Sequence, residues 1–122
     1  MGRSSAESDC YKYIQIIVLM QDKVCIIPDC NTPAQVGHHL FKRDNLNTAF
    51  HPDAVRGVCN SHHAMAHAKP IWFRDIMVEL IGGKYFELQR LANTVVPYMD
   101  FSDKRAELKG IIAKLERREG WR

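Results

Sequence analysis

The sequence predicts an α+β fold, with helices at both ends of the chain and a short β-hairpin between them. Apolar residues recur at helical spacing before residue 22 and after residue 70. Between them, residues 24–59 are rich in Pro, Asn, Asp and Gly, which suit turns and short strands better than helices. Cysteine and histidine cluster in and just after this middle segment. With 122 residues, 46% apolar and 25% charged, we expect one folded domain over residues 1–122.

The first helix is expected from Ala6 to about Asp22, because Tyr11, Ile14 and Ile17 lie near helical spacing. The pieces "VGHHLF" and "AVRGVC" are expected to form the two strands of the hairpin. Good helix formers follow over residues 61–69.

Three more helices are expected after the hairpin. Pro70 restarts the helical pattern, and the apolar stripe that follows stops at Gly82, a C-cap; its members are Ile71, Trp72, Ile76, Met77, Leu80 and Ile81. A shorter helix is expected from about residue 84 to 93, before a break at Pro97. Ser102 is the expected N-cap of the last helix, with one apolar face made of Leu108, Ile111, Ile112 and Leu115. We therefore expect a core at about residues 23–69 and a helical extension at about residues 70–119.

Four residues form two closely spaced pairs that suit a structural zinc ion. Cys25 and Cys30 flank the turn "CIIPDC", and Cys59 and His62 are separated by two residues. Thiolates and an imidazole, brought together by a hairpin, are typical ligands of a tetrahedral structural zinc site. The alternative is that the cysteines are small buried apolar side chains. Cys10 is expected to remain an ordinary thiol.

The remaining clustered histidines suit a second, catalytic metal ion. His63 and His67 are four residues apart and share one helix face, and the pair His38 and His39 lies on the hairpin. Two helix histidines and one from the hairpin could hold a divalent ion while leaving positions open for water and substrate. The other histidine of the adjacent pair would point to the opposite side of its strand and could act as a general base. The alternative is that these are ordinary surface histidines; His51 is expected in a loop.

Composition and charge exclude some classes of protein and permit others. The longest apolar run, residues 13–20, is too short to span a bilayer, and no signal-peptide cleavage pattern is present. We therefore expect a soluble, cytoplasmic protein that does not bind a membrane, with metal ligation rather than disulfides as the role of its paired cysteines. The net charge of +3 and pI near 8.7 permit nucleic-acid binding without requiring it.

Several motifs, taken in order, resemble the HNH, or ββα-metal, nuclease superfamily. "GHHL", a hairpin, "VC" with the second ligand pair, and a helix containing "HHAMAH" carry the resemblance. The order looks most like the phage recombination nucleases of the NinG (Rap) type. The matching segments are "CYKYIQIIVLMQDKVCI", "VGHHLF", "NLNTAFHPDAVRGVCNSHH", "WFRDIMVELIGGKYFELQRL" and "KRAELKGIIAKLERR", which together span about residues 10–118. The resemblance implies a small ββα-metal, treble-clef-like core stapled by zinc.

The resemblance also implies roles for individual residues. It makes His39 the general base, His38, His63 and His67 the ligands of a catalytic ion, and Cys25, Cys30, Cys59 and His62 the structural zinc site. NinG-type proteins usually have one histidine after the glycine, so the roles of His38 and His39 could be exchanged. The usual second pair is Cys-x2-Cys, so either His62 or His63 could be the structural ligand.

Ala54 departs from the family pattern. The asparagine of the HNH motif stands about nine residues before the first helix histidine, where it braces the hairpin loop and orients the base. Counting back from His63 gives Ala54, whose methyl group makes no hydrogen bond. Either a neighbour such as Asp53 or Asn45 supplies the brace, or the chain is a cleavage-deficient form, natural or engineered.

The activity implied is that of a metal-dependent DNA endonuclease using Mg, Mn, Ni or Zn. The family's substrates imply branched DNA or recombination intermediates such as Holliday junctions, and a two-fold symmetric junction implies a homodimer. The resemblance implies a phage protein in its host cell, or a prophage product. Candidate phosphate contacts are Lys42, Arg43, Arg56, Lys69 and Arg74. The competing reading is a non-catalytic zinc module that binds DNA or a protein partner.

Overall fold

The fold is α+β, mostly helical with one two-stranded antiparallel sheet. The computed structural model describes residues 3–94 and 98–118. Its elements are α1 (Ser5–Gln21), β1 (Val36–His39), α2 (Leu46–Ala49), β2 (Val55–Val58), α3 (Asn60–Ala68), α4 (Pro70–Ile81), α5 (Gly83–Ala92) and α6 (Phe101–Arg118). The break expected at Pro97 and the expected end of the extension at residue 119 lie outside the described residues.

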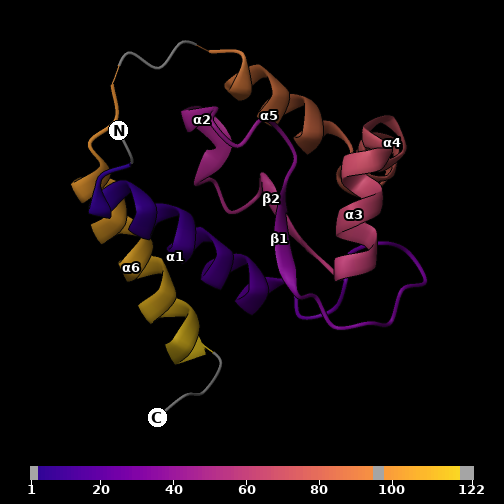
Figure 1. The fold of residues 1–122 in the computed structure, drawn as a ribbon, viewed down its shortest axis with the longest axis horizontal. Helices are drawn as coiled ribbons and strands as arrows, with labels where there is room; N and C mark the ends of the chain where they lie inside the picture. Colours follow the sequence, from indigo (N-terminus) through magenta and orange to yellow (C-terminus); the bar gives the residue numbers. More distant parts are fainter. Residues whose placement is uncertain (1–2, 95–97, 119–122) are drawn as a thin grey trace.

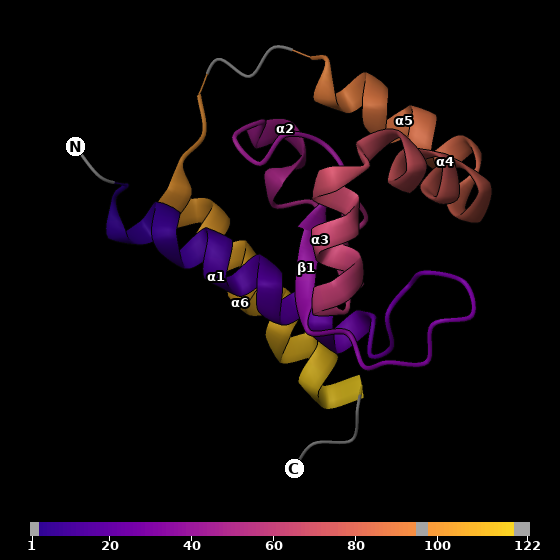
Figure 2. The same ribbon diagram turned by 45° about the vertical axis from the view of Figure 1, so that its right-hand side comes forward.

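The elements are stacked around the small sheet (Figures 1 and 2). Helix α6 runs alongside α1, and α1 in turn packs against both strands. Helix α3 contacts β1, continues into α4, and α5 then returns to α2. The sheet therefore lies between a terminal helix pair, α1 and α6, and a group of helices that begins with the histidine-bearing α3.

Helix α1 begins one residue earlier than the sequence predicts, because Ser4 is its N-cap. The Ser4 hydroxyl accepts a hydrogen bond from the backbone N–H of Glu7 at 3.1 Å, which satisfies a donor at the helix start. The buried face of α1 and the buried face of α6 form a first apolar cluster, which includes Cys10, Ile14, Ile17, Val18, Leu108 and Leu115. The apolar faces predicted for both helices are thus confirmed as core.

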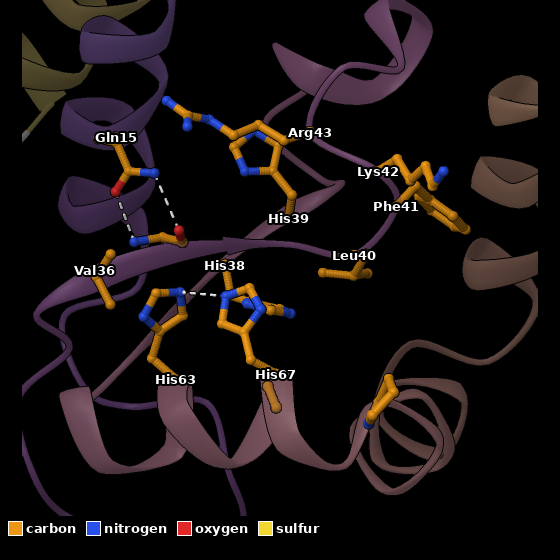
Figure 3. Close-up of a pocket in the computed structure, with 13 residues that line it drawn as sticks. Gln15, Val36, His38, His39, Leu40, Phe41, Lys42, Arg43, His63 and His67 are labelled. Carbon is orange, nitrogen blue, oxygen red and sulfur yellow. Dashed lines mark hydrogen bonds between the residues drawn. The ribbon is translucent and has the colours of Figure 1, made fainter.

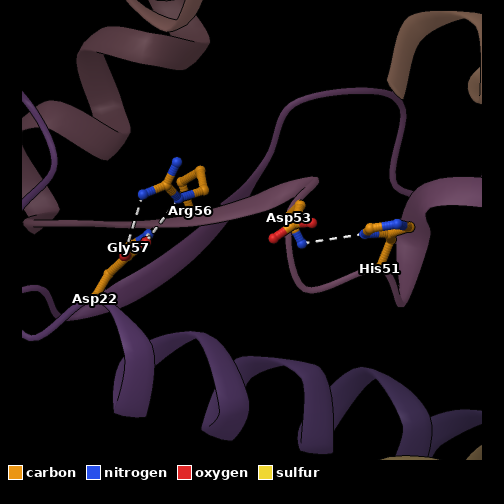
Figure 4. A network of polar contacts seen from close by, with 5 residues as sticks. All are labelled: Asp22, His51, Asp53, Arg56 and Gly57. Atoms are coloured by element: carbon orange, nitrogen blue, oxygen red, sulfur yellow. Dashed lines mark hydrogen bonds and ion pairs between the residues drawn. The ribbon is translucent and has the colours of Figure 1, made fainter. Parts of the chain in front are cut away.

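The hairpin has the predicted strands in antiparallel register, with Gly37 opposite Gly57. The edge of β1 is closed by Gln15 of α1: its amide Nε2 donates to Gly37 O at 3.0 Å, and Gly37 N donates to its Oε1 at 2.7 Å. The edge of β2 is closed by Asp22, which accepts hydrogen bonds from Gly57 N and from Arg56 (Figure 4). Gly57 O also accepts a hydrogen bond from Ile26 N at 3.0 Å, so the outward-facing backbone groups of Gly37 and Gly57 are paired on both edges of the ladder.

A second apolar cluster is formed by the turn at residues 25–30, the end of β2 and helices α3 to α5, and it includes Cys25, Val58, Cys59, Phe73, Met77 and Tyr85. The predicted stripe of α4 is only partly right, because Ile71 is 65% exposed and Leu80 is 45% exposed. Phe73 and Met77 are the buried side chains of this helix. Gly82 ends α4 as predicted, with φ of +56° and its N–H donating to Val78 O at 2.9 Å.

Two further predictions are corrected by the structure. The segment around residues 46–49 is expected from the sequence to be irregular, but it forms the helical turn α2. Asn45 caps this turn, since its Oδ1 accepts a hydrogen bond from Asn47 N at 3.1 Å. Ser102 is not the N-cap of α6 but lies inside the helix. Asp100 instead accepts hydrogen bonds from the backbone N–H groups of Ser102 and Asp103, at 2.9 and 3.1 Å. Within the described ranges, no helix combines the length and apolar character needed to cross a membrane.

Candidate metal centres

Four side chains converge where the hairpin meets the start of α3. Cys25, Cys30, Cys59 and His62 each offer one ligand atom, and these atoms all lie within 4.8 Å of one another. His62 Nδ1 is 3.5 Å from Cys25 Sγ and 3.4 Å from Cys59 Sγ. A tetrahedral zinc ion with ordinary bond lengths holds sulfur and nitrogen ligands about 3.6 Å apart. The four residues are therefore close enough to bind a metal ion such as zinc.

Local structure explains why these four residues meet. The turn that carries the first two cysteines is closed by Cys30 N donating to Ile27 O at 3.1 Å, with Asp29 in the left-handed region at φ of 67°. Cys59 is the N-cap of α3, and its sulfur accepts from His62 N at 3.5 Å. Hydrogen bonds from Thr32 lower the pKa of the Cys30 thiol to about 7, which favours the thiolate form that binds metals.

Three histidines form a second group on another face of α3. His38 of β1 and the helix pair His63 and His67 have ring nitrogens within 4.8 Å of one another (Figure 3). The Nε2 atoms of His63 and His67 are 3.1 Å apart. A divalent ion with bonds of about 2.1 Å holds adjacent nitrogen ligands about 3.0–3.4 Å apart, so this spacing fits either a shared hydrogen or a shared metal ion.

Two histidines of this group, His38 and His63, favour the neutral form that a metal ion requires. Burial, helped by the neighbouring His67, His63 and His39, lowers the pKa of His38 to about 4. Burial and His67 lower the pKa of His63. Phe73 packs against the His38 ring with centroids 4.7 Å apart, which contributes to that burial. These shifts favour the unprotonated, metal-binding form of His38 and His63 near neutral pH.

His39 points away from the three-histidine group, on the other side of β1 (Figure 3). Its Nε2 is 3.0 Å from the carbonyl oxygen of Ala49, the last residue of α2. Because a carbonyl only accepts hydrogen bonds, Nε2 carries the ring hydrogen and Nδ1 keeps a free lone pair. Burial is the main cause of a lowered pKa at His39, so the imidazole is neutral near pH 7.

One open pocket of about 590 Å³ is lined both by the three-histidine group and by His39. Its lining comprises Gln15, Val36, Gly37, His38, His39, Leu40, Phe41, Lys42, Arg43, His63, Ala66, His67 and Pro70 (Figure 3). The two cations Lys42 and Arg43 therefore share a concave surface with the histidines. An anionic ligand could reach the basic and the metal-binding side chains together.

The five predicted phosphate contacts divide into two groups. Lys42, Arg43 and Lys69 form no ion pair within the described part of the chain, and the first two line the pocket. Arg56 is held by Asp22, with Nε to Oδ2 at 2.9 Å and its guanidinium NH2 group to Oδ1 at 3.2 Å (Figure 4). Arg74 pairs with Asp75 at 3.2 Å on the surface. Arg56 is thus committed to the fold and is a poor candidate for DNA contact.

Ala54, at the position where the motif has asparagine, is 1% exposed and makes only backbone hydrogen bonds. Leu40 N donates to Ala54 O at 2.9 Å across the hairpin. Of the two suggested substitutes, Asp53 pairs with Lys84 at 3.5 Å and its N–H donates to His51 Nδ1 (Figure 4). Asn45 instead caps α2, the turn whose last carbonyl contacts His39.

Sequence reasoning did not find Gln15 or Ala49, two residues next to the histidines, and it named Asn45 only as a possible substitute brace. Gln15 binds the backbone of Gly37, Ala49 supplies the carbonyl for His39, and Asn45 caps the turn that carries Ala49. Asn45 had a local signal, since asparagine is a preferred N-cap. The roles of Gln15 and Ala49 depend on contacts across 22 and 10 positions of sequence, which no local pattern records.

Comparison with models of protein families, with curated proteins and with solved structures found no match for this chain.

Proposed function

We propose that this protein is a metal-dependent endonuclease of the HNH type that hydrolyses phosphodiester bonds in DNA. One observation carries the proposal: three histidines converge from β1 and α3, and a fourth, with one ring nitrogen free, lines the same basic pocket. Structural histidine clusters have no need of the adjacent neutral base or of Lys42 and Arg43. A polyanionic substrate makes use of all three features.

In this mechanism His39 acts through Nδ1, because Nε2–H is bound to Ala49 O. Nδ1 takes a proton from the attacking water, which adds to phosphorus in line with the leaving oxygen. Arg43 and Lys42 hold nearby phosphates and orient the strand. His38, His63 and His67 would hold the divalent ion, whose charge stabilises the transition state and the leaving oxygen. All-imidazole ligation adds no negative charge to the site, and it is compatible with Mg, Mn, Ni or Zn.

The four-residue group has a structural role in this proposal. Zinc held by Cys25, Cys30, Cys59 and His62 would join the turn at residues 25–30, which precedes β1, to the first turn of α3, where His62 directly precedes His63. It would thereby set the position of the helix that carries two catalytic ligands. The treble-clef-like, ββα-metal identity of the core, with a leading helix and C-terminal helices, is part of the same proposal.

The test is cleavage of four-way junction, duplex and plasmid DNA with Mg, Mn, Ni and Zn in turn. We expect His39→Ala to lower the rate on the order of 10²–10⁴-fold, the usual contribution of a general base. His51→Ala is the matched control, because His51 lies outside the pocket and should leave the rate unchanged. Full activity of His39→Ala would reject this assignment.

A second candidate, a non-catalytic zinc module that binds DNA or a protein partner, is favoured by one observation. The buried methyl group of Ala54 makes no side-chain hydrogen bond where the motif has asparagine. Metal analysis separates the two candidates: the nuclease should bind a second, weaker ion that His67→Ala abolishes, whereas the module should bind one tight ion only. Cleavage by Ala54→Asn but not by the present chain would identify a cleavage-deficient form.

Branched DNA as substrate, a homodimer, and a phage origin with activity in the host cytoplasm complete the proposal. Preference for a four-way junction over duplex DNA, measured by competition, would support the substrate. Light scattering tests the dimer: a mass equal to one chain, both free and on junction DNA, would contradict it.

A further inference from the structure

We propose that Asn45 is a positioning residue for His39 and that it acts through the helical turn α2. This inference rests on the role of His39 as the base. His39 has one described ring hydrogen bond, from Nε2 to Ala49 O at 3.0 Å. The orientation of the imidazole therefore depends on where the Ala49 carbonyl is held.

The turn that carries Ala49 is too short to hold its own position. Helix α2 has four residues, and a single turn is unstable in isolation because nucleation costs more than one hydrogen bond returns. Burial of Ala49 and Phe50 in the first apolar cluster holds the end of this turn, and Asn45 contributes the contacts at its start. The side-chain Oδ1 accepts from Asn47 N at 3.1 Å, and the backbone carbonyl accepts from Ala49 N at 2.8 Å. Asn45 thus contacts both the start and the end of the turn.

The same side chain also ties the turn to a separate helix. Asn45 Nδ2 donates to the carbonyl oxygen of Ala92, the last residue of α5, at 2.5 Å. The final carbonyls of a helix lack partners within the helix, so this acceptor is available. Helix α5 is anchored by the buried side chains of Tyr85 and Leu88. Asn45 therefore joins the support of His39 to the second apolar cluster.

Asparagine is the residue that can do both tasks at this position. Aspartate and serine are equally good N-caps, because each offers an acceptor oxygen to the start of the turn. Only the amide adds an N–H donor for Ala92 O while its oxygen is used by the cap. Asn47 also donates to a carbonyl just beyond α5, that of Thr94. This bond lies at the surface, and the Asn47 side chain does not cap a helix. Asn45→Asp and Asn45→Ser thus remove the hydrogen bond to Ala92 O and keep an acceptor for Asn47 N.

The test compares the ring N–H signals of histidine in the full chain with its metal bound. Nitrogen-15 NMR of the unaltered protein should show a slowly exchanging Nε2–H signal, assigned to His39 by its absence in His39→Ala. Asn45→Asp and Asn45→Ser should lose this signal, and their kcat should fall up to about 100-fold with little change in KM. Asn93→Asp is the control: it places the same charge beside Ala92, its side chain is exposed, and it caps α5 through its backbone N–H only, which the substitution keeps.

The outcomes separate this inference from the proposed function. Retention of the Nε2–H signal in both Asn45 variants would overturn the inference, as would its loss with an unchanged kcat. If Asn45→Asp fails to fold, Asn45→Ser decides, because it adds no charge near the Ala92 carbonyl. If the unaltered chain cleaves no DNA with any metal, the proposed function fails, while the NMR comparison still decides whether Asn45 orients His39.

Discussion

At the scale of residues, the protein has two pairs of consecutive histidines, His38–His39 and His62–His63, and the two members of each pair point to different sites. On a strand, neighbouring side chains point to opposite faces, so His38 faces α3 while His39 faces α2. On a helix, neighbouring side chains are about 100° apart. His62 therefore turns to the cysteines while His63 turns to His67 and His38. One chain segment can in this way serve two ligand groups.

The cysteines should differ sharply in their effect on metal content. We expect Cys30→Ser to lose the tightly bound zinc and to lower the melting temperature, because a structural ion contributes folding free energy directly. Cys10→Ser is the matched substitution, since Cys10 is buried in the other apolar cluster and belongs to neither ligand group. Metal analysis of the purified variants measures the effect. Equal zinc content in both would contradict the assigned site.

Asp22 should matter far more to stability than the surface charge pairs. It is 17% exposed, and it accepts hydrogen bonds from Arg56 and from Gly57 N. Asp22→Ala leaves these donors without a partner, and we expect a cost of about 1–3 kcal/mol in the free energy of unfolding. Arg74→Ala removes a pair that is 53% and 66% exposed, and should change it by less than about 0.5 kcal/mol. Urea denaturation measures both; equal effects would contradict this ranking.

At the scale of elements, the hairpin is confined between α1 and α3, and its two paired glycines reflect that confinement. A Cβ atom at Gly57 would lie 2.8 Å from Asp22 Cβ and 3.0 Å from Ala34 Cβ. At Gly37 it would lie 3.0 Å from Val55 Cγ1 and 3.2 Å from the Gln15 amide. The side chains that close the two strand edges leave no room for a larger residue.

Glycine substitutions in the hairpin and in α6 should have opposite effects on stability. Gly57→Ala forces the strand away from Asp22, and we expect a loss of about 1–3 kcal/mol. Gly110 lies inside α6 with nothing near its would-be Cβ, so Gly110→Ala should stabilise the protein by about 0.5–1 kcal/mol. Urea denaturation gives both values. A stabilised Gly57→Ala would show that the hairpin can shift freely.

At the scale of the whole molecule, the candidate zinc site is associated with only one of the two apolar clusters. Cys25 and Cys59 belong to the second cluster, whereas none of the four candidate zinc ligands belongs to the first. The strand β2 connects the clusters, since Val55 packs in the first and Val58 in the second. Removal of the metal should therefore destabilise the second cluster before the first.

Hydrogen exchange should reveal this division when a chelator removes the metal. We expect faster exchange first in the turn at residues 25–33 and in α3, while α1 and α6 stay protected by their shared apolar faces. Mass spectrometry of peptic fragments measures the order. Simultaneous loss of protection in α1 and α3 would show that the two clusters unfold as one unit.

The sequence predicted the helices and the hairpin well, because each depends on local signals. Apolar periodicity identified α1, α4 and α6, Gly82 marked the end of α4, and the Pro- and Gly-rich segment located the hairpin. The ligand spacing of the cysteines and histidines likewise anticipated both groups. The misses have local causes: Asp100 competes with Ser102 as the cap, and one asparagine suffices to form α2.

The sequence by itself determined the chemistry available to this protein, because the identity and spacing of Cys and His decide which ligands can meet on a turn, a strand or a helix face. Only the tertiary structure decided how that chemistry is held. The carbonyl that orients His39, the Gln15 amide on the edge of β1, and the Asp22 carboxylate that takes Arg56 all come from elements distant in sequence. Packing of α1, α2 and α5 around the hairpin brings them there, and no local pattern records such contacts.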